Sequence, residues 1–318
     1  MKTKDIQILI VSSLPPAMLD QFEQLFHVHK LWLHDDKPAY LAEHGPFIRG
    51  AVTRGGSGIA SEVINALPAL EIISSFGVGV DAIDLELARQ RGIHVANTPM
   101  VLNECVADTA LALMLCVSRR ICEADRYARA GAWLKSPFPG AMRMSGKICG
   151  IAGLGNIGHE VAKRAQGFGM TIHYYDPKLA ADPDFIRFDT LTALAESCDF
   201  LVLTLPGGEK TLHIVNAEVL AALGENGILI NIARGSVVDT QALIDALANK
   251  QIYGAGLDVF EHEPEIPPEL FAYDNVVLLP HVASNTVETR NDMANLTINN
   301  IKNYFTDGSV VTRVKLHR

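Results

Sequence analysis

The sequence predicts an α/β protein built on doubly wound parallel sheets, and three features of the chain support this fold class. Short apolar runs alternate with helical segments along most of its 318 residues. A glycine-rich turn at positions 153 to 158 joins one of these runs to a helix. The chain is also too long for one ordinary hydrophobic core. Two domains, both of the α/β type, are therefore expected.

The glycine-rich turn lies between an apolar run ending at Ala152 and a second apolar run closing at Asp176. Read as strand, turn, helix and strand, it carries Gly153, Gly155 and Gly158 at the spacing of a dinucleotide fingerprint. The first glycine permits a tight turn, the second lets the backbone approach a pyrophosphate, and the third lets the helix pack on the strand. Amides at the start of the helix then face the phosphates, where the helix dipole favours negative charge.

An acidic residue after the second strand supports the same interpretation. Asp176 follows Gly158 at close to the roughly 20-residue spacing of an acid that binds the ribose hydroxyls. This carboxylate predicts NAD as the cofactor, and NADP is less favoured because a 2′-phosphate would be repelled. A glycine turn without a ligand is the plainer interpretation, but the strand and helix context argues against it. A Rossmann-type cofactor domain is therefore predicted.

The position of this fingerprint divides the chain into an inserted domain and a surrounding one. Residues 1–98 show a second strand and helix rhythm, while residues 288–318 carry apolar side chains at helical spacing and should pack back onto them. We expect a Rossmann-type domain at 99–287, inserted into a smaller flavodoxin-like α/β domain formed by the two outer segments. Six parallel strands are expected in the inserted domain, the number in a complete dinucleotide fold, at 148–152, 171–176, 199–206, 227–235, 254–260 and 276–281.

Four strands are expected in the first domain, at 6–13, 51–56, 71–81 and 93–98. The loop from Ser75 to Asp84 follows a strand and contains Gly77 and Gly79, so its backbone amides could form an anion-binding nest. An ordinary strand-to-helix turn explains the same pattern equally well. A long helix is expected at 102–130, and its apolar centre predicts burial between the domains or against another subunit.

Composition and charge exclude several classes of function. The chain is 48% hydrophobic and 20% charged, as in ordinary globular proteins. Its formal net charge of −9 argues against a nucleic-acid partner, which requires concentrated Lys and Arg. The apolar run in the long helix is far shorter than the ~20 residues of a membrane span, and no cluster of His and Cys indicates a metal site. Five cysteines without CxxC spacing fit a reducing, cytoplasmic compartment.

Three polar residues follow apolar runs of the cofactor domain, at the carboxyl edge where ligands bind in such sheets. They are Arg234, Glu263 and His281. An arginine offers a permanent, planar, two-pronged donor for the carboxylate and keto oxygen of a 2-keto acid. A histidine moves protons near neutral pH, and a neighbouring carboxylate would hold its tautomer and favour its charged form. Singly, each could be an ordinary surface or loop residue; their joint placement indicates a catalytic set.

Several motifs, taken in order, give the chain a close resemblance to the D-specific 2-hydroxyacid dehydrogenase family. These motifs are FGVGVDAID, HVANTP, VADTALALML, GLGNIG, NIARGSVVD, GLDVFEHEP and LLPHVASNT. The resemblance implies interconversion of a small 2-keto acid and its D-2-hydroxy acid with NAD(P), and a homodimer formed around the long helix. It gives Arg234 the role of substrate-binding arginine, Glu263 that of carboxylate partner and His281 that of the acid/base.

The same resemblance implies the binding residues. The substrate would be bound by the backbone amides of Val78 and Gly79 together with Arg234 and His281. Arg54, on the same edge of the first domain, is a further candidate for the substrate pocket, and a solvent-exposed loop residue is the equal alternative. No metal ion is required, because protonation by histidine and polarisation by arginine replace a Lewis acid. The implied cofactor-binding residues are Gly153, Leu154, Gly155, Asn156, Ile157, Gly158, Asp176, Thr204, Pro206, Ile232, Ala233, Arg234, Asp258 and His281.

Alternatives remain within and beyond this family. The loop LPGGEKT resembles the branch that reduces glyoxylate, hydroxypyruvate, 2-ketogluconate or hydroxyphenylpyruvate. That branch often carries Arg or Ser after the second strand for the NADP phosphate, whereas this chain has Asp176 and Pro177. An NADP-preferring 2-ketogluconate or hydroxyphenylpyruvate reductase is thus one alternative, and a non-catalytic NAD-sensing protein on the same fold is another. Phosphoglycerate and formate as substrates are disfavoured, formate because Glu263 accompanies His281.

Overall fold

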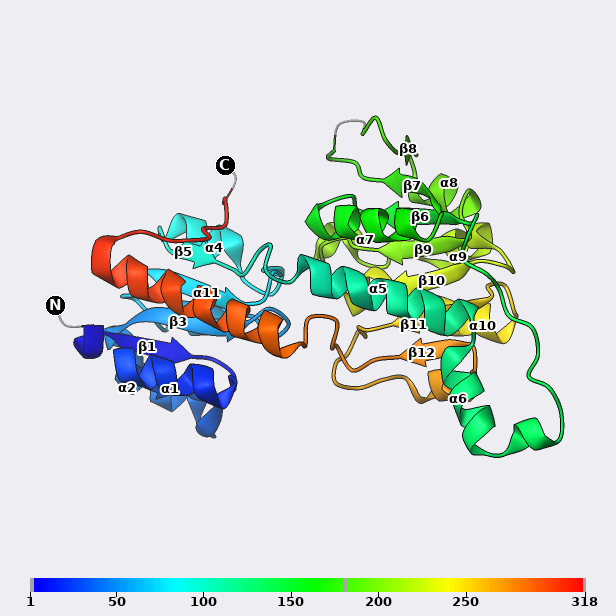
Figure 1. The fold of residues 1–318 in the computed structure, drawn as a ribbon. Coiled ribbons are helices and arrows are strands. Elements are labelled where there is room, and N and C mark those ends of the chain that lie inside the picture. Colours follow the sequence, from blue (N-terminus) through cyan, green and yellow to red (C-terminus); the bar gives the residue numbers. More distant parts are fainter. Residues whose placement is uncertain (1–2, 180–181, 317–318) are drawn as a thin grey trace. The chain divides into compact units, whose positions relative to one another are not determined.

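The computed structural model describes residues 3–179 and 182–316 of the chain, which divides into two compact units. Unit 1 comprises Met1–Leu102 and Thr286–Arg318, and unit 2 comprises Asn103–Asn285. In Figure 1 the blue, cyan and red elements belong to unit 1, and the green to yellow elements belong to unit 2. Each unit is built on an all-parallel sheet with helices, which confirms the predicted α/β fold class.

Unit 1 contains a five-stranded sheet in the order β2-β1-β3-β4-β5, which is the flavodoxin-like order. The sequence prediction lacked β2, because its sequence HVHK contains a single apolar residue. The strands are β1 (Gln7–Ile10), β2 (His27–Lys30), β3 (Ile48–Arg54), β4 (Ile72–Phe76) and β5 (His94–Ala96).

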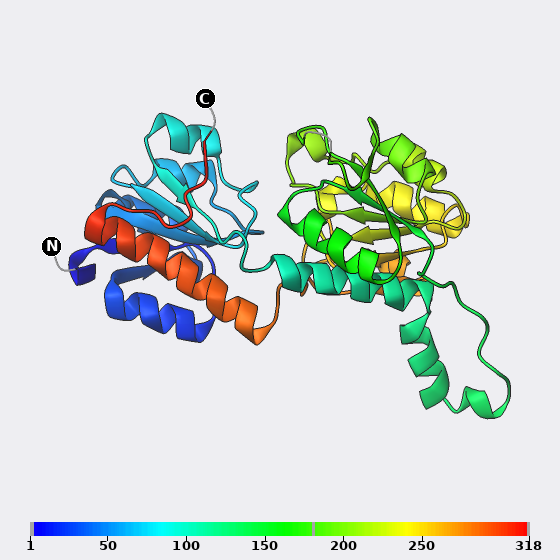
Figure 2. The ribbon, with the colours of Figure 1, turned by 45° about the horizontal axis from the view of Figure 1, so that its top comes forward.

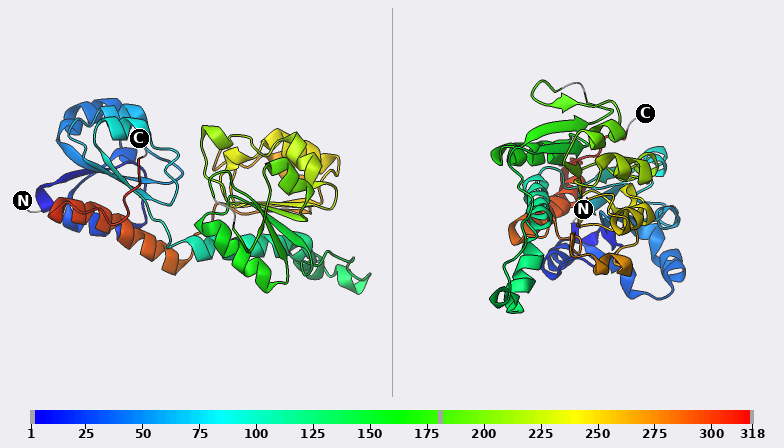
Figure 3. Two further views of the ribbon diagram at one scale, coloured as in Figure 1. Left: turned by 90° about the horizontal axis from the view of Figure 1, so that it is seen from above. Right: turned by 90° about the vertical axis from the view of Figure 1, so that its right-hand side faces the viewer.

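Helices cover both faces of this sheet. On one face, alternate strand residues form a core with α2 (Lys37–His44), α3 (Ser61–Asn65) and α4 (Leu85–Gln90). On the other face, α11 (Val287–Asp307) packs on β4 and beside α1 (Pro16–Leu25), as Figure 3 shows. The tail of the chain therefore packs onto the sheet of unit 1.

The ends of α11 are defined by local chemistry. The side chain of Thr286 accepts the amide of Thr289 at 3.2 Å, which satisfies one of the unpaired donors at the helix start. Gly308 closes the helix with φ of 80°, a left-handed conformation that glycine adopts without steric cost.

Unit 2 contains a seven-stranded sheet in the order β12-β11-β10-β9-β6-β7-β8. Counted along the unit from β6, its first six strands have the order 3-2-1-4-5-6 of a dinucleotide-binding fold. The prediction of six strands was wrong, because β8 is a pair of exposed residues, too short to give an apolar run. The strands are β6 (Ile148–Ala152), β7 (Thr171–Tyr175), β8 (Ile186–Arg187), β9 (Phe200–Leu203), β10 (Ile228–Asn231), β11 (Gly254–Leu257) and β12 (Val276–Leu278).

The long helix expected at 102–130 is two helices. Arg120 has φ of 54°, a left-handed conformation that ends α5 (Asn103–Ser118) and precedes α6 (Ile121–Arg129). The apolar residues of α5 are buried against β10, β11 and α7 of the same unit. Contact is close, because a Cβ on Gly256 of β11 would lie 2.9 Å from the Cβ of Leu113. A glycine at this strand position therefore permits the approach of α5.

The remaining helices of unit 2 are α7 (Asn156–Gly167), α8 (Leu191–Glu196), α9 (Ala217–Leu223) and α10 (Thr240–Ala248). Figure 2 shows α6 and the following 3-10 turn η4 (Ala132–Leu134) projecting from the rest of the unit. In this projecting arm, Trp133 is 74% exposed and Leu134 is 94% exposed. In the part of the chain that the structure describes, no helix combines the length and the hydropathy needed to cross a membrane.

Candidate active site

The glycine-rich turn connects the end of β6 to the start of α7. Gly153 has φ of 95°, which side chains other than glycine rarely tolerate. A Cβ on Gly158 would lie 2.4 Å from the carbonyl oxygen of Gly153, so glycine is needed for the helix to begin against the turn. A Cβ on Gly155 would meet nothing within 4 Å. This open space beside the first amides of α7 fits a phosphate group, as the fingerprint requires.

The acid predicted to bind the ribose lies over this turn. One carboxylate oxygen of Asp176 accepts the amide of Leu154 at 3.1 Å. The other accepts the amides of Lys178 at 2.9 Å and Leu179 at 3.2 Å. Three backbone donors therefore hold the carboxylate beside the glycine turn, in the position that the fingerprint assigns to the adenosine ribose. The residues present fit a nicotinamide dinucleotide.

The other predicted cofactor residues follow the neighbouring strands. Asn156 and Ile157 are the first two residues of α7. Thr204, just beyond β9, donates its hydroxyl to the carbonyl of Gly153 at 2.5 Å, which supports the glycine turn. Pro206 lies in the same loop. Ile232 and Ala233 come directly after β10 and are 7% and 6% exposed, and their contacts with the dinucleotide stay a prediction.

Glu263 and His281 are brought together by the fold. Their carboxylate Oε2 and imidazole Nδ1 are 2.7 Å apart, and a carboxylate oxygen can only accept, so Nδ1 carries the proton. Burial opposes ionisation of Glu263, but the hydrogen bond and charge of His281, the amide of Phe260 and the charge of Arg234 together hold its pKa below the ordinary value. An ionised carboxylate then fixes the tautomer of His281 and leaves Nε2 for proton transfer.

Asp258 anchors the backbone that carries His281. It is 1% exposed. Its carboxylate oxygens accept the amides of Val282 at 2.7 Å and Ala283 at 2.9 Å, and its carbonyl accepts the amide of His281 at 2.8 Å. Burial raises the pKa of Asp258 despite these two hydrogen bonds, which act in the opposite direction. The sequence assigned Asp258 to the dinucleotide, which stays a prediction, and missed this anchoring role.

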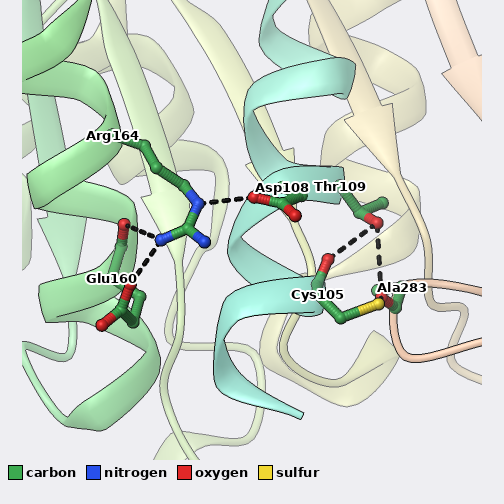
Figure 4. A network of polar contacts seen from close by, with 6 residues as sticks. All are labelled: Cys105, Asp108, Thr109, Glu160, Arg164 and Ala283. Carbon is green, nitrogen blue, oxygen red and sulfur yellow. Dashed lines mark hydrogen bonds and ion pairs between the residues drawn. The ribbon is translucent and has the colours of Figure 1, made fainter. Parts of the chain in front are cut away.

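Helix α5 holds the same segment from another side. Cys105 Sγ at 3.1 Å and Thr109 Oγ1 at 3.3 Å both donate to the carbonyl of Ala283 (Figure 4). One turn along the helix, Asp108 pairs with Arg164 of α7 at 2.5 Å. Helix α5 thus connects the helix that begins at the glycine turn with the segment after β12.

Arg234 lies just beyond β10, at the same carboxyl edge of the sheet. Its guanidinium donates to the carbonyl of Ala233 at 2.8 Å. Its own carbonyl accepts the side-chain amide of Asn231 at 2.9 Å. Its positive charge also contributes to lowering the pKa of Glu263. All three residues predicted as catalytic thus belong to one edge of unit 2.

The remaining predicted substrate residues belong to unit 1. The carbonyl of Gly77 accepts the amide of Thr98 at 3.0 Å, and the carbonyl of Val78 accepts the side-chain amide of Asn97 at 2.7 Å. In a planar trans peptide the next N–H points opposite to the carbonyl. The amides of Val78 and Gly79 therefore point away from these partners, as an anion-binding nest requires.

Arg54 is the last residue of β3 and is exposed. The next residue, Gly55, donates its amide to the carbonyl of Phe76 at 3.2 Å, and a Cβ on Gly55 would lie 3.5 Å from the Cα of Gly77. Arg54 therefore lies at the same edge of unit 1 as the loop that contains Val78, and its role in substrate binding stays a prediction. Within residues 3–179 and 182–316, no group of three or more His, Cys, Asp or Glu is placed to hold a metal ion.

An oriented histidine occurs in the same unit as the dinucleotide turn, at the edge of the sheet where ligands bind. A proton donor at this edge defines a dinucleotide-dependent oxidoreductase, since a carbonyl that receives hydride at carbon must receive a proton at oxygen. Residues 111–283 match the family model described as D-isomer specific 2-hydroxyacid dehydrogenase, NAD binding domain. The chain belongs to the D-isomer specific 2-hydroxyacid dehydrogenase family.

Individual relatives extend this match to the whole chain. A glyoxylate/hydroxypyruvate reductase of Arabidopsis thaliana is 44% identical over 311 residues, which cover 98% of this chain and 99% of the relative. The crystal structure of a 2-hydroxyacid dehydrogenase from Ketogulonicigenium vulgare is 42% identical and aligns over 100% of both chains with a TM-score of 0.92. An NADPH-dependent glyoxylate/hydroxypyruvate reductase from Sinorhizobium meliloti, solved with NADP and malonate, is 39% identical, with a TM-score of 0.91 over 98% of this chain and 97% of the other. The predicted family, fold class and NAD(P)-dependent enzyme class are thereby confirmed.

The open space at Gly155 separates cofactor binding from folding. We expect Gly155→Val to leave thermal stability without cofactor nearly unchanged, because its Cβ would meet nothing within 4 Å. The same side chain would occupy the phosphate position and weaken NADH binding by roughly tenfold or more. In contrast, Gly158→Val would push against the carbonyl of Gly153 and lower stability as well. Fluorescence titration with NADH and thermal unfolding of both variants check this; intact NADH binding by Gly155→Val would contradict it.

Proposed function

We propose that the protein is an NAD-dependent reductase of a small 2-keto acid of the glyoxylate and hydroxypyruvate class, which it converts reversibly into the D-2-hydroxy acid. The 2.7 Å contact between Glu263 and His281, beside the charge of Arg234, carries this proposal. It supplies a proton donor with a fixed tautomer and a permanent cation for an anionic substrate. The named reductases among the relatives support the same class of substrate.

Each residue has a defined task in this reaction. Bound NADH supplies hydride to the keto carbon. His281 donates the proton from Nε2 to the keto oxygen, while Glu263 keeps Nδ1 protonated and stabilises the imidazolium. Arg234 binds the substrate carboxylate and polarises the keto group. In unit 1, the amides of Val78 and Gly79 form an anion nest that can bind a carboxylate.

Proton transfer by His281 predicts opposite pH dependences for the two directions. Reduction consumes a proton and needs the imidazolium, so its rate should persist at low pH and fall, with a measurable midpoint, as pH rises. Oxidation needs the neutral imidazole and should rise over the same interval. Because the carboxylate of Glu263 favours the charged imidazole, Glu263→Gln should move both midpoints to lower pH. Rates of both directions measured across pH check these shifts, and an unshifted profile would remove Glu263 from the mechanism.

Loss of the imidazole itself should affect catalysis far more than binding. We expect His281→Ala to lower kcat roughly 10²-fold to 10⁴-fold, the usual contribution of general acid–base catalysis, with little change in NADH affinity. Steady-state kinetics and NADH titration measure the two effects separately. Near-normal kcat in this variant would mean that another group moves the proton.

Asp176 should make the enzyme prefer NAD to NADP. Three amides hold its carboxylate over the glycine turn, where it would accept from the ribose hydroxyls and repel a 2′-phosphate. Asp176→Ser should therefore lower kcat/KM with NADH and raise it with NADPH. The NADPH dependence of the Sinorhizobium meliloti relative makes this comparison informative. Wild-type enzyme that uses NADPH as well as NADH would refute the proposed preference.

A panel of 2-keto acids tests the function and its alternatives together. Glyoxylate and hydroxypyruvate should be reduced with higher kcat/KM than 2-ketogluconate or hydroxyphenylpyruvate. A non-catalytic NAD sensor would bind NADH and reduce none of them. If Arg54 contributes to the substrate pocket, Arg54→Ala should change the order of preference among the panel, whereas an exposed loop arginine would leave that order unchanged.

The same proposal includes a homodimer formed through the projecting arm of α6 and η4. Support comes from the exposure of Trp133 and Leu134, since apolar patches of this kind mark interaction surfaces. We also place the protein in the cytoplasm, because none of its five cysteines forms a disulfide bond, as expected in a reducing compartment. Sedimentation of the wild type and of Trp133→Ala/Leu134→Ala checks the oligomer.

A further inference from the structure

A second histidine and carboxylate pair lies next to the predicted catalytic set in unit 2. His213 Nε2 and Glu261 Oε1 are 2.7 Å apart. The other oxygen of Glu261 accepts the hydroxyl of Thr240, at the start of α10, at 2.8 Å. Burial opposes ionisation of Glu261, but the donors His213 and Thr240 hold its pKa below the ordinary value. The carboxylate is therefore ionised and held from two sides.

His213 belongs to a segment that pairs with the turn after β10. The amide of His213 donates to the carbonyl of Ser236 at 2.8 Å, and the amide of Val215 donates to Val237 at 3.1 Å. The amide of Asp239 donates to the carbonyl of Val215 at 3.0 Å. His213 itself has φ of 51°, an uncommon conformation for a residue with a side chain. The backbone of segment 213–215 is thus fixed to the turn that begins at Arg234.

The same turn presses against the loop after β11. A Cβ on Gly235 would lie 1.9 Å from the carbonyl carbon of Phe260 and 2.3 Å from the amide of Glu261. Two backbones approach this closely only when one of them has glycine. Phe260 also donates its amide to the carboxylate of Glu263 at 3.1 Å. The residue beside Arg234 is therefore in contact with the loop that positions Glu263.

We propose that His213 and Glu261 are positioning residues that fix the turn carrying Arg234 against the loop carrying Glu263. His213 is bonded to the turn through its backbone and to the loop through its side chain, so the pair spans the two segments. Arg234 and Glu263 lie in the segments that follow the neighbouring strands β10 and β11, and this bond adds a link between their positions. The inference rests on the catalytic roles proposed above for Arg234, Glu263 and His281.

Stability alone does not explain such a pair. The side chains of His213 and Glu261 are 40% and 22% exposed, and partly exposed ion pairs contribute little to folding. Catalysis is far more sensitive to position, since a displacement of about 1 Å can lower a rate roughly 10²-fold. The structure therefore predicts a variant that folds normally and reacts slowly.

The test uses His213→Ala, Glu261→Ala and the double variant in the full-length enzyme with NADH and glyoxylate. Each single change should lower kcat roughly 10- to 100-fold, with thermal unfolding and NADH affinity nearly unchanged. The effects should not add in the double variant, because both remove the same bond. The pH midpoint of reduction should move to lower pH, as in Glu263→Gln, because the displaced carboxylate favours the imidazolium less. His213→Gln, which keeps a donor without the charge, should restore part of kcat.

His262→Ala is the matched control, since it removes an exposed histidine from the same loop. Its kcat should stay close to that of the wild type. Normal kcat in His213→Ala would overturn the proposal, as would a lowered kcat with an unshifted pH midpoint. His281→Ala, measured in parallel, distinguishes the two levels of inference. If it retains kcat, the proposed site is wrong; if it loses kcat while His213→Ala does not, only the positioning role is wrong.

Discussion

The geometry of the proposed site in unit 2 depends most on the hydrogen bonds made by the buried carboxylate of Asp258. It joins the end of β11 to the segment after β12 through the amides of Val282 and Ala283. A carboxylate at 1% exposure is unfavourable unless its oxygens are hydrogen-bonded, so these two amides have a strong reason to stay in place. His281, the residue just before them, is thereby fixed in its left-handed conformation. The buried carboxylate of Asp258 needs its two amide partners, and these partners in turn fix the position of the His281 imidazole.

Much of the fold could be predicted because its main features are local in the sequence. The glycine turn, the apolar strands and the helical tail can each be recognised from a short stretch of sequence. The parallel topology follows from the alternation of strands and helices. The elements that were missed lack such local features. Strand β2 is formed by HVHK, β8 has two exposed residues, and the helix break at Arg120 involves neither glycine nor proline. These depend on tertiary contacts that override local propensity.

The proposed site shows the same division. The placement of Arg234, Glu263 and His281 at the carboxyl edge follows from the strands that precede them, and the family resemblance implies that Glu263 accompanies His281, while their catalytic roles stay a proposal. The anchoring role of Asp258 and the pairing of His213 with Glu261 could not be predicted. The first joins groups 24 positions apart in the sequence, and the second joins groups 48 positions apart. Neither separation follows from strand periodicity. Residue type indicates what a side chain can do, and only the fold shows which partner it meets.

Local charge compensation makes the proposed binding of an anionic acid at this edge compatible with an acidic protein. The chain has a formal net charge of −9, and three carboxylates lie close to the site, from Asp258, Glu261 and Glu263. Each is engaged by a donor of its own: two backbone amides, His213 with Thr240, and His281 with the amide of Phe260. The three carboxylates are therefore bonded to donors of the protein itself, while the guanidinium of Arg234 supplies a permanent positive charge. Selectivity for an anion at such a site depends on these local pairings rather than on the sign of the whole molecule.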